Sequence, residues 1–527
     1  MKTYLYQLLF LSFAINSAFS QSPEIKWWFD TNSFCAGMAA AADLDGDGTL
    51  EIVFGCYRND GGIYALKAVD GSLLWSYFPH NPPHQGCNDT APLIYDVDGN
   101  GQLDVIIASS CTPKTICLDG KTGDLKWEAP TRGSDSPPTI VDFNNDGRLQ
   151  ILHGEFLGWV RSLDAATGEF LWEIQVHENS WIQTAPTVVD LNNNGQLDFV
   201  VGTWAFDNTD SLYAFDGKTL ERLWATPIHG FMYHGTAVAD FDNDGIPDLL
   251  IGSYNDTLYC INGMNGEIKW KYAASGAIAA PVVVADIDND GECDVVFTSW
   301  ISVSVLNSKG ELKWERFIPD FTSSFRGPVV ADINGDQYLD IIMGTYGGKL
   351  IAFNGKDGTL LIEVDLKDHF GNSPFNINHA PVVADFNGNG ILDAFVVGGH
   401  GEWPNIENGF GRAYAVSLGA GNGPDWLMFQ RDERRQSSMC YDYLSPVKSP
   451  LTKKSFIEIF PNPTNGVLNI NGAFQTATLE VFNSLGQKLS THYLESGNSS
   501  LEFKNKGFFI LRFNVDEELI SKKLMVR

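Results

Sequence analysis

The chain has 527 residues, of which 65 are acidic and 35 are lysine or arginine, so its formal net charge at pH 7 is −30. Nucleic acid is therefore not an expected partner, because phosphate binding needs clustered cations. Residues 451–527 hold nine basic against seven acidic residues, so the negative charge lies in residues 21–450, much of it in repeated loops.

The first 20 residues have the pattern of a signal peptide. Lys2 precedes an apolar stretch at 8–14, and small residues follow up to Ser20. We expect the mature chain to begin near Gln21. No later apolar run approaches the roughly 20 residues that a spanning helix needs, so no transmembrane segment is expected after signal removal.

A nine-residue acidic motif then recurs along the chain. It has Asp at position 1, Asp or Asn at positions 3 and 5, usually Gly at position 6 and most often an acid at position 9. Its eight copies begin at Asp43, Asp96, Asp142, Asp190, Asp240, Asp286, Asp332 and Asp385, 46 to 53 residues apart. A fixed period of this size indicates a repeat architecture, and oxygen ligands at alternate positions indicate a hard cation.

Each repeat has the pattern of four short strands. Around Asp240 they are predicted at 235–240, 249–252, 257–261 and 267–272. Four strands per period of 46–53 residues predict one propeller blade each, so the expected fold is an all-β, eight-bladed propeller, with seven blades as the alternative.

The eighth repeat lacks a directly following fourth strand. Residues 24–27 repeat residues 267–270 letter for letter, so we expect the N-terminal strand to complete the last blade and close the ring. The segment 426–429 is the competing candidate for that position.

A glycine turn followed by tryptophan marks the fourth strand. The six tryptophans are Trp75, Trp127, Trp172, Trp224, Trp270 and Trp314, and the seventh repeat has Ile362 there. These rings are predicted to pack between neighbouring blades, each burying on the order of 200 Å².

The acidic loops are predicted to bind several structural calcium ions through side chains at positions 1, 3, 5 and 9 and a backbone carbonyl at position 7. No Glu stands at position 12 in the first and fifth copies, and no helices flank the loops, so they are not EF-hands. The expected ligands are Asp43, Asp45, Asp47, Thr49, Glu51, Asp96, Asp98, Asn100, Gln102, Asp104, Asp190, Asn192, Asn194, Asp198, Asp240, Asp242, Asp244, Ile246, Asp248, Asp286, Asp288, Asp290, Glu292, Asp294, Asp332, Asn334, Asp336, Tyr338, Asp340, Asp385, Asn387, Asn389 and Asp393.

The loops differ in carboxylate content. Those that begin at Asp43, Asp240 and Asp286 hold four carboxylates each and should bind most tightly. The Asp142 loop ends in Gln150 and is expected to stay empty. The alternative for the poorer loops is that they only form Asx turns.

These patterns resemble two known groups of propellers. The acidic loops are similar to the FG-GAP or VCBS repeats of integrin-α-type propellers, and the turn-tryptophan strands resemble quinoprotein dehydrogenase blades. The resemblance covers roughly residues 24–430 of a predicted propeller domain at 21–443. It implies a fold but no function, because propellers carry unrelated chemistries.

The face of the ring opposite the acidic loops carries longer, irregular loops, where binding usually resides. Aromatic side chains there, such as Trp181, Phe231, Tyr233 and Trp403, could stack on a glycan or contact a protein, or they could pack the crossovers. Histidines predicted on this face are His80, His84, His177, His229, His234, His369, His379 and His400. A ring of aromatics that ends strand two, expected to pack between blades, is Tyr57, Phe156, Trp204, Tyr254, Trp300 and Tyr346.

No catalytic or cofactor-binding residue is identified. The chain has no zinc-protease helix, nucleophile elbow or phosphate loop. Cys35 and Cys56 flank the first acidic motif and Cys87 and Cys111 the second, which predicts either disulfides or buried free thiols.

The C-terminal part differs in composition. Residues 444–455 are rich in Pro, Ser and Lys and predict a linker, and residues 456–527 show short alternating strands typical of a small β-sandwich. The stretches 461–466, 481–487, 507–513 and 522–527 closely resemble the sorting domain of type IX secretion cargo. The resemblance implies export across the outer membrane, contact with the secretion and sorting machinery, and release or attachment at the cell surface. A carbohydrate-binding sandwich is the alternative, but no aromatic platform supports it.

The sequence therefore predicts a secreted or cell-surface calcium-binding propeller with an adhesion or ligand-binding role towards a glycan or protein. The alternative function is a polysaccharide-active lyase or hydrolase, whose carboxylates and histidines would converge from distant blades.

Overall fold

The computed structural model describes residues 23–441, apart from 36, 81–85, 89, 112, 372 and 402–408, and the stretches 456–460, 464, 467–473, 477–483, 488–494, 497–503, 506–515 and 518–526. The predicted signal peptide, the predicted linker, His84 and Trp403 lie outside these residues. The chain divides into two compact units, Met1–Leu444 and Ser445–Arg527.

Nearly all regular structure is β-strand, which confirms the predicted all-β class. The described helices are two short 3₁₀ turns, η2 (Pro319–Phe321) and η3 (Lys367–Phe370). Within the described ranges, no helix has the length and apolar character that crossing a membrane requires.

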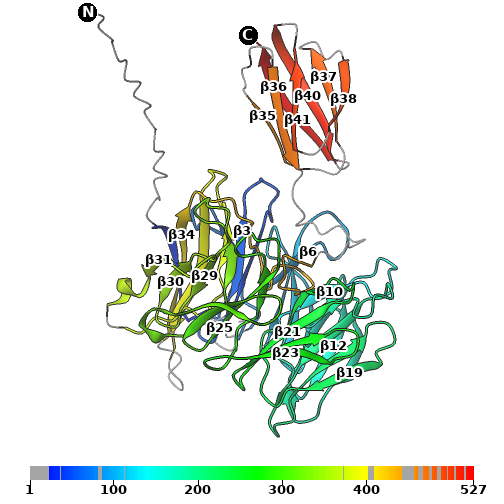
Figure 1. The fold of residues 1–527 in the computed structure, drawn as a ribbon, viewed down its shortest axis with the longest axis vertical. Helices are drawn as coiled ribbons and strands as arrows, with labels where there is room; N and C mark the ends of the chain where they lie inside the picture. Colours follow the sequence, from blue (N-terminus) through cyan, green and yellow to red (C-terminus); the bar gives the residue numbers. More distant parts are fainter. Residues whose placement is uncertain are drawn as a thin grey trace, which may run out of the picture. The chain divides into compact units, whose positions relative to one another are not determined.

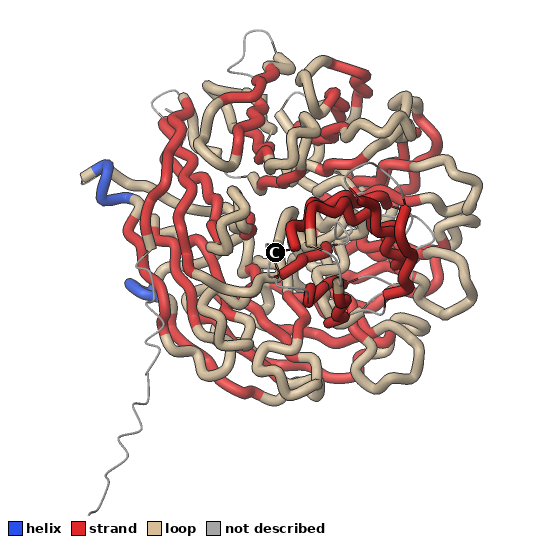
Figure 2. The backbone as a smooth tube through the Cα atoms, turned by 90° about the horizontal axis from the view of Figure 1, so that it is seen from above, coloured by secondary structure: helices blue, strands red, loops and turns tan. Residues whose placement is uncertain are grey.

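The first unit consists mainly of four-stranded antiparallel sheets that surround a common centre (Figures 1 and 2). Seven of these sheets follow the chain order: β2–β3–β4–β5 (Ala39–Ala42, Glu51–Gly55, Ile63–Lys67, Leu73–Tyr77), β6–β7–β8–β9 (Leu93–Tyr95, Asp104–Ser109, Lys114–Asp119, Leu125–Pro130), β10–β11–β12–β13 (Thr139–Val141, Gln150–Gly154, Trp159–Asp164, Phe170–Gln175), β15–β16–β18–β19 (Thr187–Val189, Asp198–Gly202, Ser211–Asp216, Arg222–Pro227), β20–β21–β22–β23 (Ala237–Ala239, Asp248–Ser253, Thr257–Asn262, Ile268–Ala273), β24–β25–β26–β27 (Val283–Ala285, Asp294–Ser299, Ser302–Leu306, Leu312–Phe317) and β28–β29–β30–β31 (Val329–Ala331, Asp340–Gly344, Lys349–Phe353, Leu360–Asp365). A small extra ladder joins β14 (Ser180–Trp181) to β17 (Trp204–Ala205).

The eighth sheet joins the two ends of the unit. Its order is β1–β34–β33–β32, with β32 at Val382–Ala384, β33 at Leu392–His400 and β34 at Phe410–Gly419. The N-terminal strand β1 (Glu24–Thr31) pairs antiparallel with β34, and β32 contacts β2 of the first sheet. The predicted closure by the N-terminal strand is therefore confirmed, and the competing segment 426–429 does not form that strand.

The fourth strands link each sheet to the next one. Trp75, for example, donates its indole N–H to the carbonyl of Gly120, in the strand-three to strand-four turn of the following sheet, at 2.7 Å. Trp27, Trp127, Trp224, Trp270 and Trp314 make the equivalent bond to Ala68, Ala165, Gly263, Ser308 and Gly355. This confirms the predicted packing role for these rings. Trp172 also packs on the next sheet, with its ring centroid 5.9 Å from that of Phe199, but its indole N–H bonds elsewhere.

A segment after β34 fills the centre of the unit. The innermost strand of a sheet has one unpaired edge, and its N–H groups need acceptors when they are buried. Carbonyl groups of residues 423–437 supply these acceptors. They bind the N–H groups of Ala41, Ile140, Val188, Val238, Val284, Asp332 and Val383, from seven of the eight sheets, at 2.7–3.2 Å.

Arg435 anchors this central segment. Its guanidinium is fully buried and donates to the carbonyls of Pro138, Phe429 and Pro92 at 3.0, 2.6 and 3.3 Å. Pro92 precedes β6, so the remaining sheet is also connected to the segment. No pattern in the sequence predicts this arrangement.

Three disulfides are present in the described residues. The bonds Cys35–Cys56 and Cys87–Cys111 confirm the predicted pairs, and a third bond joins Cys293 to Cys440 at the end of the central segment. Cys117 and Cys260 are buried free thiols.

The second unit contains two antiparallel sheets (Figure 1). One has the order β35–β36–β39 (Phe456–Phe460, Val467–Ala473, Gly497–Glu502), and the other β38–β37–β40–β41 (Lys488–Leu494, Ala477–Asn483, Gly507–Val515, Glu518–Val526). Side chains from both sheets, including Leu468, Leu479 and Phe513, share one buried cluster, so this unit has a core of its own.

Candidate functional site

The acidic loops share one backbone conformation that their sequence spacing explains. The carboxylate at position 1 accepts the N–H of position 6, as Asp43 Oδ2 does from Gly48 at 3.0 Å and Asp385 Oδ2 from Gly390 at 2.7 Å. Gly48 has a φ of +90°, in the left-handed region that glycine favours. The turn is kept even where Gln337 replaces glycine, with a φ of +73°. The repeated spacing therefore encodes a repeated turn.

In five of the loops, the carboxylate at position 9 is hydrogen-bonded through only one of its two oxygens. Asp340 Oδ2 accepts the N–H of Ile333 at 3.1 Å, while its Oδ1 is buried and has no partner among the described residues. Glu51 Oε1, Asp198 Oδ1, Asp248 Oδ1 and Asp393 Oδ1 are likewise buried without a hydrogen bond there. A buried acceptor without a partner is costly, and a cation would satisfy these oxygens. The donor set therefore fits a hard divalent ion.

Carboxylates converge in four of the loops. In each of these, three side chains have oxygens within 4.8 Å of one another. The groups are Asp43, Asp45 and Glu51; Asp96, Asp98 and Asp104; Asp240, Asp242 and Asp244; and Asp286, Asp288 and Asp290. Three of these loops are the predicted richest ones, and the Asp96 loop joins them. In the described chain, the Asp190, Asp332 and Asp385 loops do not gather three acids in this way.

Lysine side chains contact the carboxylates of these four loops, a feature absent from the predictions made from the sequence. Lys126 Nζ lies 2.7 Å from Asp98 and 2.8 Å from Asp104, and Lys269 lies 2.7 Å from Asp242 and 2.9 Å from Asp248. Lys67 and Lys313 contact the loops at Asp43 and Asp286. Lysine therefore offsets part of the repulsion between the clustered carboxylates. Lys126, Lys269 and Lys313 directly precede a fourth-strand tryptophan, and this recurrence was the available signal.

Two of the loops predicted to bind calcium lack such a lysine. Leu223 and Leu361 stand at the corresponding positions beside the Asp190 and Asp332 loops. Burial raises the pKa of Asp198 to about 7 and that of Asp340 to about 8. Burial also raises the pKa of Glu51 to about 7 in the first loop. These carboxylates are therefore held in surroundings that favour protonation unless a cation is present.

The Asp142 loop, predicted to stay empty, has its last side chain occupied within its own sheet. Gln150 Oε1 accepts hydrogen bonds from the Ser162 hydroxyl at 2.9 Å and the Trp172 indole at 3.0 Å. Arg148 bonds to Asp164 at 2.6 Å rather than to the loop. This loop offers a cation fewer oxygens than its neighbours do.

The histidines of the opposite face divide into buried and exposed groups. His234 and His379 are buried, and burial lowers the pKa of His379 to about 3 and that of His234 well below its usual value, with Arg326 nearby adding to both effects. His80 is also buried, whereas His229 and His369 are exposed. The packing interpretation therefore holds for His80, His234 and His379.

The aromatic residues at the ends of the second strands fall into a packed group and an exposed group. Trp204 stacks on Phe231 with ring centroids 4.3 Å apart, and Phe156 contacts Trp181 at 4.8 Å. Tyr57 and Tyr254 pack against Phe34 and Trp204 in the same way. Trp300 and Tyr346 instead remain more than half exposed. The predicted packing role is confirmed for the first four residues and is wrong for Trp300 and Tyr346.

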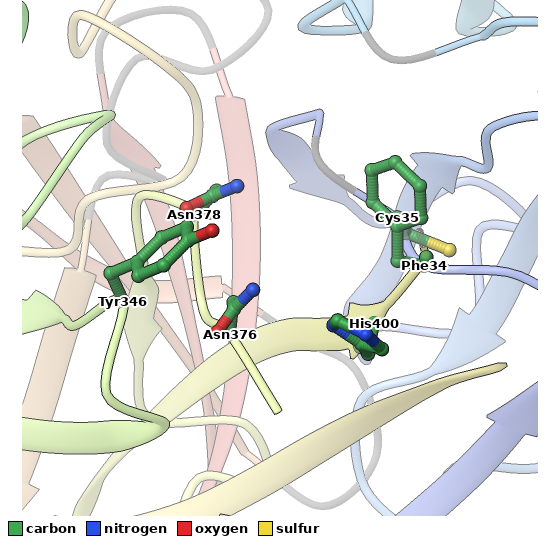
Figure 3. A pocket seen from close by; sticks show the side chains of 8 residues that line it. Phe34, Cys35, Tyr346, Asn376, Asn378 and His400 are labelled. Carbon is green, nitrogen blue, oxygen red and sulfur yellow. The ribbon is translucent and has the colours of Figure 1, made fainter. Parts of the chain in front are cut away.

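A pocket opens beside Tyr346 on this face (Figure 3). Its volume is about 190 Å³, and its lining comes from the end of β29, the crossover before β32, the end of β33 and the segment after β1. The lining residues are Phe34, Cys35, Tyr346, Asn376, Asn378, Gly399, His400 and Gly401. Of these, only His400 and Tyr346 were named by the sequence analysis for this face.

Two family matches cover parts of the chain. FG-GAP-like repeats match residues 190–251, 240–297, 286–343 and 332–396, and a secretion system C-terminal sorting domain matches residues 458–527. Both predicted resemblances are thus confirmed. The sorting domain indicates export by type IX secretion to the cell surface or the extracellular space.

Solved structures share the propeller fold at low sequence identity. The Vibrio cholerae biofilm matrix protein Bap1 is 15% identical, with a TM-score of 0.56 over 77% of this chain and 94% of that one. Quinohemoprotein alcohol dehydrogenase from Comamonas testosteroni is 14% identical, with a TM-score of 0.53 over 76% and 77%. The C-terminal WD40 domain of Sif2 is 11% identical, with a TM-score of 0.51 over 76% and 99%. No curated protein sequence matches the chain.

Proposed function

The chain carries FG-GAP-like repeats and a sorting domain for type IX secretion, and from this we propose that it is a calcium-stabilised, eight-bladed propeller that binds a ligand at the cell surface. The blade count is supported by eight four-stranded sheets in the described first unit, the last of them completed by β1. The shared core of the second unit supports a small β-sandwich for the sorting domain.

The proposed calcium sites are the acidic loops. The observation that carries this part is the set of five buried carboxylate oxygens at position 9 that have no hydrogen bond in the described chain, those of Glu51, Asp198, Asp248, Asp340 and Asp393. Calcium supplies a compact charge with six to eight oxygen contacts, and it stabilises the folded state by mass action. Its role here is structural, because these loops lie on the face opposite the pocket.

Ligand binding is preferred to catalysis because of the lining of the pocket. A glycoside hydrolase needs a pair of carboxylates around the scissile bond. The eight lining residues include no carboxylate, but they do offer two amides and two aromatic rings. We therefore propose a glycan- or protein-binding adhesion module rather than the alternative lyase or hydrolase.

The export part is tested by deletion of residues 456–527 in the native host. We expect the truncated chain to accumulate in the periplasm, whereas the full chain becomes accessible to surface labelling. Normal surface display of the truncated chain would refute the sorting role.

The binding part is tested with the full mature chain on immobilised glycans and matrix proteins, with calcium and with chelator. We expect calcium-dependent retention on at least one surface. A chain that is folded and calcium-loaded but retained by none of them contradicts the binding function.

A further inference from the structure

We propose that the pocket beside Tyr346 binds one neutral sugar ring of an exposed polysaccharide. This inference rests on the proposed binding function and specifies its ligand. The pocket holds about 190 Å³, which is below the range of about 300–1,000 Å³ typical of pockets for drug-sized ligands. Its size therefore suits a single small ring better than an extended ligand.

The charge of the lining points to a neutral ligand. None of the eight lining residues is Asp, Glu, Lys or Arg, although the whole chain carries a formal charge of −30. Among the described lining residues a cation would find no carboxylate, and an anion would find no lysine or arginine while the acidic protein around it repels it. An uncharged polar molecule is the class that remains.

The polar groups of the pocket match hydroxyl groups. Asn376 and Asn378 each carry one amide oxygen that accepts and one NH₂ group that donates, and a sugar hydroxyl can do both. Figure 3 shows these amides beside the Tyr346 ring, with Phe34 and His400 across the pocket. The Asn378 Oδ1 atom is buried and has no hydrogen-bond donor among the described residues.

The walls of the pocket are fixed before a ligand arrives. The backbones of Asn376 and Gly399 exchange two hydrogen bonds, at 2.8 and 3.0 Å, and the disulfide Cys35–Cys56 holds the opposite wall. A Cβ atom at Gly399 would lie 2.8 Å from Phe34 Cα, so glycine permits this close approach. A preformed site loses little conformational freedom when it binds.

Exposed aromatic rings continue from the pocket over the two preceding sheets. Tyr346 is 52% exposed, Trp300 59% and Phe321 67%. Phe321 lies in the crossover between β27 and β28, which runs past the other two rings. Backbone bonds show this: Ile318 N–H donates to the carbonyl of Ile301, next to Trp300, and Tyr346 N–H donates to that of Ser323. Flat rings of this kind can stack on further sugar units, so a chain longer than one ring would gain contacts.

The test uses the full mature chain with calcium in native gels that contain dextran, mannan or galactan as neutral probes, and alginate as the charged probe. We expect at least one neutral polysaccharide to retard the protein and alginate not to do so. Asn378→Ala and Tyr346→Ala should each weaken the retardation by about tenfold, since each removes one contact to the sugar.

Phe206→Ala is the matched control, because Phe206 is also an exposed aromatic, in the loop between β17 and β18, outside the pocket. It should bind as the unmodified chain does, and all three variants should keep the calcium-loaded melting temperature. Retardation by alginate alone, by no neutral probe, or equally in the pocket variants overturns the inference. Binding to a matrix protein that the pocket variants leave intact would overturn it while leaving the proposed function in place.

Discussion

Trp172 donates its indole N–H to the side-chain oxygen of Gln150, 3.0 Å away in its own sheet, whereas the other fourth-strand tryptophans bond to the following sheet. One residue explains this difference, in the turn of the next sheet that faces each tryptophan. Where Trp75 packs, Gly123 of the turn Asp-Gly-Lys-Thr-Gly lets the ring approach so closely that a Cβ would lie 2.7 Å from it. The turn that faces Trp172 has Leu220 instead, with a φ of +61°.

Replacing Gln150 tests this local network. Gln150→Met keeps the length of the side chain but removes the acceptor for both Trp172 and Ser162. We expect the free energy of unfolding to fall by about 1–3 kcal/mol, because two donors in the sheet lose their partner. Denaturant unfolding measures the change. Gln175→Met, at an exposed position, is the control and should change the stability by less than about 0.5 kcal/mol.

Glu51→Gln tests the calcium loops, because its effect on stability should differ in sign between excess calcium and chelator. The amide still accepts the N–H of Leu44 but removes the charge that a cation would meet. With calcium in excess, the variant should bind one ion fewer and lose about 2.7 kcal/mol of stability at a hundredfold excess over the dissociation constant. In chelator at pH 8 it should be at least as stable as the original chain, because it no longer buries a charged oxygen that lacks a hydrogen bond and has only a 3.9 Å ion pair with Lys67.

Metal analysis after dialysis and thermal unfolding measure both effects of Glu51→Gln. Asp146→Asn, in the loop expected to stay empty, should leave the calcium content unchanged. Equal melting temperatures of the original chain in calcium and in chelator would contradict a structural role for the ion.

Two buried arginines should respond in opposite ways to replacement by methionine. Arg435 places its guanidinium on three carbonyl oxygens, and Arg435→Met should lower the stability by about 3 kcal/mol or more. Arg326 is also buried but has no carboxylate within ion-pair distance in the described chain, and its Nε–H finds no acceptor there. Arg326→Met should therefore be neutral or stabilising, by up to about 2 kcal/mol. Urea unfolding of both variants measures the two changes in stability. A large loss of stability with Arg326→Met would contradict the prediction.

His379 should make the stability depend on pH. Its pKa is lowered by burial to about 3, below the value of about 6.5 in an unfolded chain. The unfolded state therefore binds the proton first, so the stability from this group is complete above pH 6.5 and is lost as the pH falls towards 3. Between pH 7 and pH 4.5 the original chain should lose about 2 kcal/mol more than His379→Gln does. Parallel pH profiles of the two proteins would contradict the assignment.

Much of the first unit could be predicted from the sequence because its signals are local. The acidic turn depends on residues within nine positions of one another, and the bond from Asp43 to Gly48 spans five. Strands, turns and the two nearby disulfides follow from the same short spacing. The closing strand β1 was found although it pairs with β34 far along the chain, because residues 24–27 repeat a fourth strand letter for letter.

Only the tertiary structure decided what fills the centre and what forms the pocket. Residues 423–437 show no repeat in their sequence. Their carbonyl groups accept hydrogen bonds because the inner edges of the surrounding sheets place unpaired N–H groups around this segment. The bond Cys293–Cys440 and the pocket between Phe34 and Asn378 join residues that are 147 and 344 positions apart. Contacts of this kind depend on how the sheets close around the centre, and no local spacing encodes that closure.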